Sequence, residues 1–166
     1  VGAVMAIAGA VAAVLVNDGA PWPVAVAAAL GAGLACGLWN GVLVAVIGIQ
    51  PIVATLILMV AGRGIAQLIT DGRILTFNDP GLAAIGGGAW LGLPSPVWIT
   101  LAAALALILL TRRTALGLFI EAIGVNPAAS RLSGVNSRMV VISVYVASGL
   151  MAALAGAVVL GGVGFF

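Results

Sequence analysis

The chain has 166 residues, of which 64% are hydrophobic and only 6% are charged, with a formal net charge of +2 at pH 7. Soluble domains average about 45–50% apolar and about 25% charged residues, so this composition predicts a protein whose solvent is the lipid bilayer. The small, scattered charge excludes a nucleic-acid-binding surface. The sequence has no His, no Lys and one cysteine, Cys36, which excludes zinc sites, His-based catalysis and intrachain disulfides. We expect no metal, no cofactor and no enzymatic activity.

Five apolar segments predict an all-α fold, a polytopic transmembrane helix bundle of about five spans. The segments are residues 1–16, 24–49, 52–70, 97–110 and 139–163. A helix needs about 20 residues to cross the hydrocarbon core, so the short fourth segment is expected to extend into residues 94–96 or Thr111. The chain begins without a methionine inside an apolar segment and ends just after one. We therefore expect residues 1–166 to be one transmembrane domain within a longer protein.

The placement of arginine predicts how the chain crosses the membrane. Four of the six arginines fall within residues 111–138, where they and Glu121 give a net charge of +3. The turn at residues 17–23 and the loop at residues 71–96 lie on the opposite face and together carry −2. Because Arg and Lys are enriched in cytoplasmic loops, residues 111–138 are predicted to be cytoplasmic and residues 71–96 to be periplasmic.

The predicted outer loop contains an apolar stretch that is too short and too rich in glycine to span the membrane, residues 81–93 (GLAAIGGGAWLGL). It fits two interpretations equally. The stretch either dips into the outer interface with Trp90 and Trp98 as anchors, or forms an ordinary packed surface loop.

Small residues recur at four-residue spacing in two of the apolar segments. Such rows let helix backbones approach closely, which is a main source of helix association in lipid. The rows are Ala29, Gly33, Gly37 and Gly41 in the second segment, and Gly149, Ala153, Ala157 and Ser148, Ala152, Gly156 in the last. They predict a compact bundle.

The segment 111–138 carries the signals of a short helix. Asn126 is a favoured N-cap, Pro127 suits the first helical position and Gly134 suits the position after the C-cap. A helix of about seven residues is too short to be stable alone in water, so it must pack on the bundle or on a partner protein. From spacing and caps alone, a plain connector between two spans is an equal alternative.

Three stretches together resemble a known family. Residues 124–135 (GVNPAASRLSGV) resemble the cytoplasmic signature of the ribose/xylose/galactose-type permeases of ABC sugar importers, with Ser130 standing where that signature has Ala or Arg. Residues 50–56 (QPIVATL) with 61–64 (AGRG), and residues 145–156 (YVASGLMAALAG), resemble two further family segments. The run 49–77 is most similar to the galactofuranose-type members, and the matches extend over nearly the whole chain.

The resemblance implies a permease subunit that forms the translocation path of a sugar importer in the bacterial inner membrane. It implies as partners a second permease subunit, cytoplasmic ATP-binding subunits that hydrolyse ATP, a periplasmic sugar-binding protein and membrane lipid. It also implies that segment 111–138 is a coupling loop. The residues expected to couple to the ATPase are Glu121, Gly124, Asn126, Pro127, Ala128, Ala129, Ser130, Arg131, Ser133 and Gly134.

Arg63 is the one charge inside an apolar segment. An Arg at that depth costs about 2.5–3.5 kcal/mol on insertion scales and usually faces a cavity or a partner. With Gln67 one turn further out, it forms either a polar stripe along the sugar path or a structural pair with an acid such as Asp71. Asn40 and Thr55 are two further candidates for the path.

Four alternatives to this function remain. An ion-coupled transporter is disfavoured because the apolar segments contain no Asp, Glu or His for a relay. A channel bundle outside the ABC class is the second alternative, and copurification of a cytoplasmic ATPase would distinguish the importer from it. An intramembrane enzyme would need a nucleophile–base pair that the sequence does not offer. The last alternative is a fragment that does not function by itself.

Overall fold

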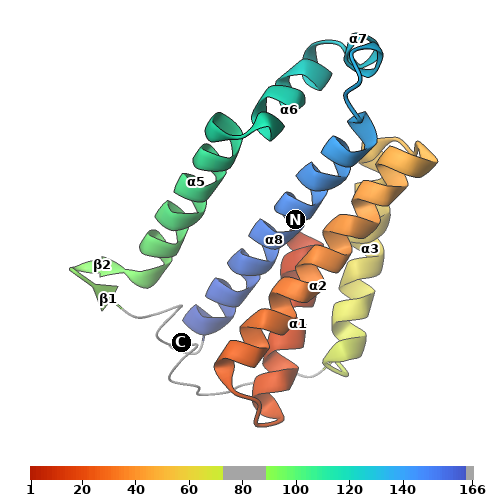
Figure 1. Ribbon diagram of the computed structural model, residues 1–166. Helices are drawn as coiled ribbons and strands as arrows, with labels where there is room; N and C mark the ends of the chain where they lie inside the picture. Colours follow the sequence, from red (N-terminus) through yellow and green to blue (C-terminus); the bar gives the residue numbers. More distant parts are fainter. Residues whose placement is uncertain (73–88, 164–166) are drawn as a thin grey trace.

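The computed structural model describes residues 1–72 and 89–163 (Figure 1). Within these residues the chain is helical apart from one short hairpin. The elements are α1 (Gly2–Asn17), α2 (Trp22–Val42), η1 (Leu43–Ile47), α3 (Pro51–Ile69), β1 (Ala89–Trp90), β2 (Leu93–Pro94), α5 (Ser95–Arg113), α6 (Ala115–Val125), α7 (Pro127–Leu132) and α8 (Ser137–Val163). The predicted all-α bundle is confirmed.

Proline and glycine set the helix boundaries. A proline stands at the first or second position of α2, α3 and α5, where its missing N–H and fixed φ carry no penalty. After α2 the helix widens into the π-helical turn η1, which ends at Gly48 with φ of 81°. That left-handed conformation suits glycine, which has no Cβ. Each apolar segment therefore starts and stops where its local sequence permits.

Among the described residues, four helices are long and apolar enough to cross a membrane: Trp22–Ile47, Pro51–Ile69, Ser95–Arg113 and Ser137–Val159. The expected extension of the short fourth segment is confirmed, because α5 runs from Ser95 to Arg113 and has 19 residues. α1 has 16 residues, just under the usual range of about 17–25. It lies inside the bundle against α2, α3 and α8, and seven of its residues are buried.

The closest packing is between α2 and α8, and it is made by the predicted rows of small residues. A Cβ placed on Gly37 would lie 2.5 Å from the Tyr145 carbonyl oxygen and 2.9 Å from Val146 Cα. A Cβ on Gly33 would meet Gly149 and the Ala153 methyl group. The two rows of α8 serve different neighbours: Gly149 faces α2, whereas Gly156 faces the backbone of Met5 on α1.

α5 stands apart from this bundle (Figure 1), and of its residues only Ser95 is buried within the described parts of the chain. It follows a hairpin in which Ala89 pairs with Pro94 and Trp90 with Leu93. Leu91 and Gly92 form the turn with φ of 52° and 80°, as a type I′ turn requires. Residues 81–88 lie outside the described residues, so the two interpretations of residues 81–93 both stay open.

The segment 111–138 differs from the expected loop with one short helix. α5 extends to Arg113, and the apolar residues that follow form a second helix, α6, of 11 residues. The corner between α5 and α6 is tight, because a Cβ on Gly117 would collide with the carbonyl of Thr111 and lie 2.9 Å from Thr111 Cα. The short helix α7 then follows where its capping signals predict it.

Candidate functional site

The helix α7 is fixed at both ends by its own sequence. The Asn126 side-chain oxygen accepts hydrogen bonds from the backbone N–H groups of Ala128 and Ala129, each at 3.1 Å. At the other end the N–H of Gly134 donates to Arg131, and that of Val135 donates to Ser130. With Gly134 at φ of 85°, these bonds form a Schellman motif. The predicted N-cap and C-terminal glycine are both confirmed.

α7 is also tied to the long helix α8. Arg131 Nε donates a hydrogen bond of 3.1 Å to Ser137 Oγ, and Ser137 is the first residue of α8. Ser130 is buried, and its hydroxyl donates to the carbonyl oxygen of Asn126. The sequence analysis named Arg131 but missed Ser137. A hydroxyl residue next to Asn136, at the start of an apolar helix, is the sequence feature that could have identified Ser137. A four-residue link and a side-chain hydrogen bond therefore join the two helices.

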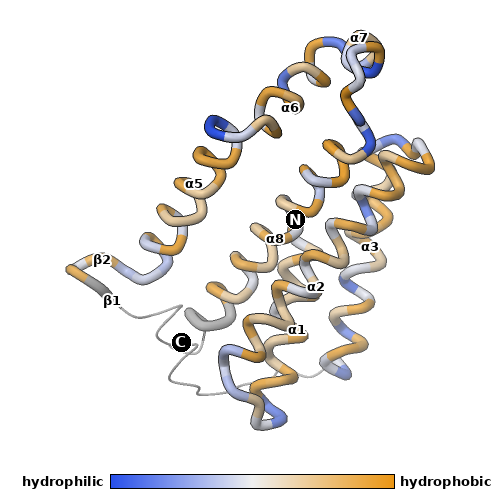
Figure 2. Tube along the Cα trace, in the orientation of Figure 1, coloured by the Kyte–Doolittle hydropathy of each residue, from blue (hydrophilic) through white to orange (hydrophobic). Residues whose placement is uncertain are grey.

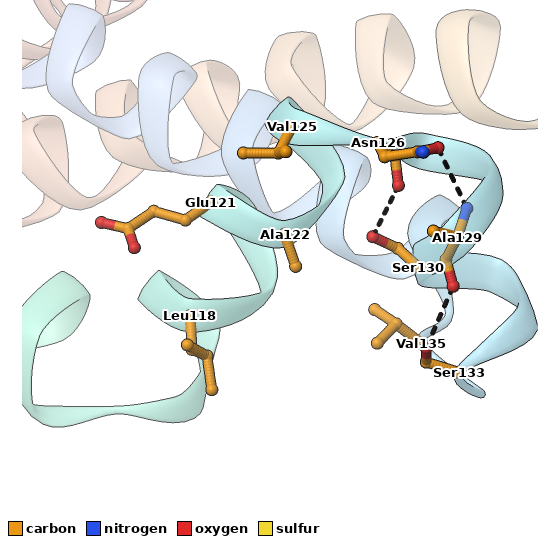
Figure 3. A pocket seen from close by; sticks show the side chains of 9 residues that line it. All are labelled: Leu118, Glu121, Ala122, Val125, Asn126, Ala129, Ser130, Ser133 and Val135. Carbon is orange, nitrogen blue, oxygen red and sulfur yellow. Dashed lines mark hydrogen bonds between the residues drawn. The ribbon is translucent and has the colours of Figure 1, made fainter.

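A groove of about 490 Å³ lies between α6 and α7 (Figure 3). Two of the apolar side chains that line it are exposed, Val125 at 87% and Leu118 at 66%, and Leu132 of α7 is 91% exposed. Figure 3 shows Glu121 projecting from α6 away from α7. The groove is lined by Leu118, Glu121, Ala122, Val125, Asn126, Ala129, Ser130, Ser133 and Val135. Exposed apolar side chains gathered around one hollow are a feature of surfaces that contact a protein or a membrane.

The predicted coupling residues fall into one neighbourhood with different environments. Five of them line the groove: Glu121, Asn126, Ala129, Ser130 and Ser133. Gly124, Pro127, Ala128, Arg131 and Gly134 lie beside it and are exposed. Of the ten predicted coupling residues, Ser130 alone is buried, with 6% of its surface exposed. It supports α7 from inside rather than presenting a side chain to a partner.

A second pocket of about 300 Å³ is walled on one side by Val1, Gly2 and Ala3, and it brings together three of the four predicted path residues, Asn40, Thr55 and Arg63. Gln67 is not among them, since it lies in a different hollow with Asp71. Within residues 1–72 and 89–163, no ion pair joins Arg63 to Asp71. The structural pair considered from the sequence is therefore absent, and Arg63 is exposed toward this pocket.

Asn40 is the least satisfied polar group that the structure describes. The residue is 7% exposed, and its Oδ1 is buried without a hydrogen-bond partner. Leaving a buried acceptor unpaired costs about 1–3 kcal/mol. Thr55 differs, because its hydroxyl donates back to the carbonyl oxygens of Pro51 and Ile52 at 2.9 and 3.0 Å.

Hydrophilic residues gather at the ends of the helices and at the corners between them. Figure 2 shows mostly hydrophobic helices, with hydrophilic residues gathered around α7, at the α5–α6 corner and in the turn between α1 and α2. Apolar helices of spanning length, joined by short connections, define a multi-pass membrane protein. No nucleophile–base pair or cluster of metal-ligating side chains lies in the described parts of the chain.

The chain belongs to the family of permease components of branched-chain amino acid transport systems, which it matches over residues 1–165. It is a multi-pass protein of the bacterial inner membrane. The family consists of transport subunits rather than enzymes.

Its curated relatives are named for sugars. The chain is 57% identical to the galactofuranose transporter permease protein YtfT of Escherichia coli K12, over 96% of the chain and 47% of the relative. It is 41% identical to the fructose import permease protein FruF of Bifidobacterium longum and 42% identical to the ribose import permease protein RbsC of E. coli K12, over 94% of the chain and 45% and 50% of those relatives. The chain spans about half the length of the curated relatives it matches. No solved structure matches it.

Proposed function

We propose that this chain is the membrane-spanning part of a permease subunit in an ABC-type sugar importer. The observation that carries the proposal is the 57% identity to a galactofuranose transporter permease over 96% of the chain. The family description mentions branched-chain amino acids, but relatives at 41% and 42% identity are named for fructose and ribose. Sugar is therefore the cargo favoured by the relatives.

The coupling element in this proposal is the pair α6–α7. A pump must link ATP hydrolysis in one subunit to movement in another, so the link needs contacts that differ between two states. The groove between α6 and α7 offers an apolar surface for an ATPase subunit, with Leu118 and Val125 exposed in its lining. The bond between Arg131 and Ser137 would pass a displacement of α7 directly to α8.

The proposed complex contains a second permease subunit, two cytoplasmic ATP-binding subunits and a periplasmic sugar-binding protein. The exposed apolar faces of α3 and α5 are left for lipid or for the other permease subunit. In this arrangement residues 111–138 face the cytoplasm, as the arginine bias favours, and residues 71–96 face the periplasm.

Ala129→Asp in the assembled importer tests the coupling role. Ala129 is the third residue of α7 and receives the Asn126 cap. An acid in the first turn of a helix is favourable for the helix itself. If the groove docks an ATPase subunit, however, the carboxylate becomes desolvated without a partner. We expect normal insertion of the variant but loss of sugar-stimulated ATPase activity and of copurifying ATPase subunits.

The matched control is Ala20→Asp, the same substitution in the turn between α1 and α2 at the other end of the bundle. It should leave both insertion and ATPase stimulation unchanged. Wild-type stimulation and full recovery of the complex with Ala129→Asp would show that α7 is a plain connector. Failure of the wild-type permease to copurify with any ATPase would instead support a channel or carrier outside the ABC class.

A further inference from the structure

The hairpin that precedes α5 carries an unusual residue at its tip. Leu91 and Gly92 form the two-residue turn between β1 and β2, and Leu91 has φ of 52°. Turns of this kind strongly prefer Asn, Asp or Gly at their first central position, and a bulky residue with positive φ is strained. The Leu91 side chain is nevertheless 89% exposed. Neither backbone preference nor packing within the described residues accounts for a leucine at this position.

The apolar surface continues from the tip onto α5. Leu93 of β2 and Val97 and Trp98 in the first turn of α5 are also exposed. No charged residue occurs from residue 80 to residue 111. Exposed apolar surface is a feature of contacts with a protein or a membrane, and protein interfaces have a polar rim. An uncharged surface that continues into a helix of spanning length complements lipid instead.

The length of α5 places the hairpin at the edge of the hydrocarbon core. Nineteen residues from Ser95 to Arg113 make a helix about 28 Å long, close to the core thickness of about 30 Å. Arg112 and Arg113 in the last turn can extend their charged groups into one interface. The helix then reaches the opposite edge at its first residue. Strands of two residues, about 7 Å long, match the interfacial layer beyond that edge, which is about 5–7 Å thick.

α5 also lacks the packing that would otherwise fix its depth. Among the described elements it packs mainly on α6 and β2, without comparable contact with α1, α2, α3 or α8, and Figure 1 shows it apart from them. The depth and tilt of a spanning helix are set by neighbouring helices and by interfacial anchors. The pairing of β1 with β2 helps to satisfy backbone groups at this depth, which an irregular loop would leave open.

We infer that the hairpin β1–β2 is a membrane anchor whose tip, Leu91, inserts into the lipid interface at the end of α5 opposite Arg112 and Arg113. Its partner is a phospholipid surface. The inference goes beyond the proposed function, because it concerns how α5 is held in the bilayer and is independent of the cargo. In the proposed orientation this interface is the periplasmic one.

Fluorescence quenching in vesicles of phosphatidylethanolamine and phosphatidylglycerol tests the anchor in the full-length permease. A Leu93→Cys variant in a Cys36→Ala background carries an environment-sensitive nitrobenzoxadiazole label. We expect blue-shifted emission that is quenched by a doxyl group placed near the lipid headgroup but not by aqueous iodide. The matched control is Asp18→Cys, an exposed residue in the turn between α1 and α2. Its label should be quenched by iodide.

Substitutions at the tip then test the role of Leu91 itself. Leu91→Asn gives the turn a residue that it prefers, so the hairpin should persist while the apolar contact is lost. The label at Leu93→Cys should lose its blue shift and become accessible to iodide. Leu91→Met keeps an unbranched apolar side chain and should leave the label in lipid. The variants are compared at equal abundance in the membrane, so that loss of folding is not mistaken for loss of anchoring.

Three results would overturn the inference. One is quenching of the label at Leu93→Cys by iodide and not by doxyl lipid, which would place the hairpin in water. Another is shielding from both quenchers, or shielding from iodide only after a periplasmic sugar-binding protein is added, which would identify a protein contact. The last is undiminished quenching by doxyl lipid in the Leu91→Asn variant. Each of these results is compatible with sugar-stimulated ATPase activity, so failure of the anchor is distinguishable from failure of the proposed function.

Discussion

Substitution of Gly37 by alanine should loosen the α2–α8 interface on which the bundle depends. The added Cβ would lie 2.5 Å from the Tyr145 carbonyl oxygen, 2.9 Å from Val146 Cα and 3.1 Å from the Tyr145 carbonyl carbon. All three atoms belong to the backbone of α8, so no side-chain rotation can relieve the contact. Ordinary van der Waals contact for a Cβ starts at 3.4 Å, so the two helices must separate by about 0.9 Å.

The energetic consequence follows from how tightly protein interiors are packed. Inserting a methyl group into a well-packed region typically costs about 1–3 kcal/mol. Separation of the helices also weakens the adjoining contacts, because a radial gap of 0.5–1 Å forfeits roughly a quarter to a half of a dispersion well. We therefore expect Gly37→Ala to destabilise the purified permease by about 1–3 kcal/mol.

Gly31 provides the matched control within the same helix. No heavy atom lies within 4 Å of the Cβ that alanine would add there, and alanine has the higher helix propensity by up to about 1 kcal/mol. Gly31→Ala should therefore be neutral or stabilising. Both variants are compared by thermal unfolding in mild detergent, followed by Trp fluorescence. Equal midpoints for Gly37→Ala and Gly31→Ala would refute the argument that backbone proximity at Gly37 holds α2 and α8 together.

Two further predictions concern orientation and the cap of α7. In a Cys36→Ala background, Leu132→Cys should react with a membrane-impermeant maleimide only from the cytoplasmic side, and Asp18→Cys only from the periplasmic side. Both residues are exposed. Reaction of both cysteines from the same side would contradict the predicted topology. Asn126→Ala removes the acceptor for two backbone N–H groups and should cost α7 about 0.5–2 kcal/mol, seen as reduced sugar-stimulated ATPase activity. Asn126→Asp, which keeps a capping oxygen, should restore it, and equal activities of the two variants would argue against the cap.

The spanning helices and the cap of α7 were predictable because each depends on short stretches of chain, whereas the orientation stays a prediction. Apolar length sets which segments can span a bilayer, and arginine counts favour an orientation without reference to packing. Asn126, Pro127 and Gly134 act on backbone groups within a few residues of themselves, so their roles follow from spacing alone. The small-residue rows likewise predicted close helix packing, although not which helices meet.

The helix α6 was not predicted, because the apolar residues after Thr114 are too few to span and were assigned to a loop. Its existence depends on a corner that only Gly117 permits, since any Cβ there would collide with Thr111. The bond from Arg131 to Ser137 was missed for a related reason. It joins residues across a turn whose geometry is set by Gly134 and by the start of α8.

The two candidate sites show most clearly what the sequence determined and what only the tertiary structure decided. The sequence by itself identified Asn40, Thr55, Arg63 and Gln67 as the polar residues of apolar helices, because such residues are costly in lipid and usually functional. It could not sort them, because α2 and α3 meet beside α1 only in the folded bundle. Packing leaves Asn40 Oδ1 buried without a partner, places Arg63 in the same pocket as Asn40, and places Gln67 and Asp71 in another hollow. Composition and local periodicity determine that a segment is a membrane helix, but the close approach of small residues far apart in the chain decides which side chains share a pocket.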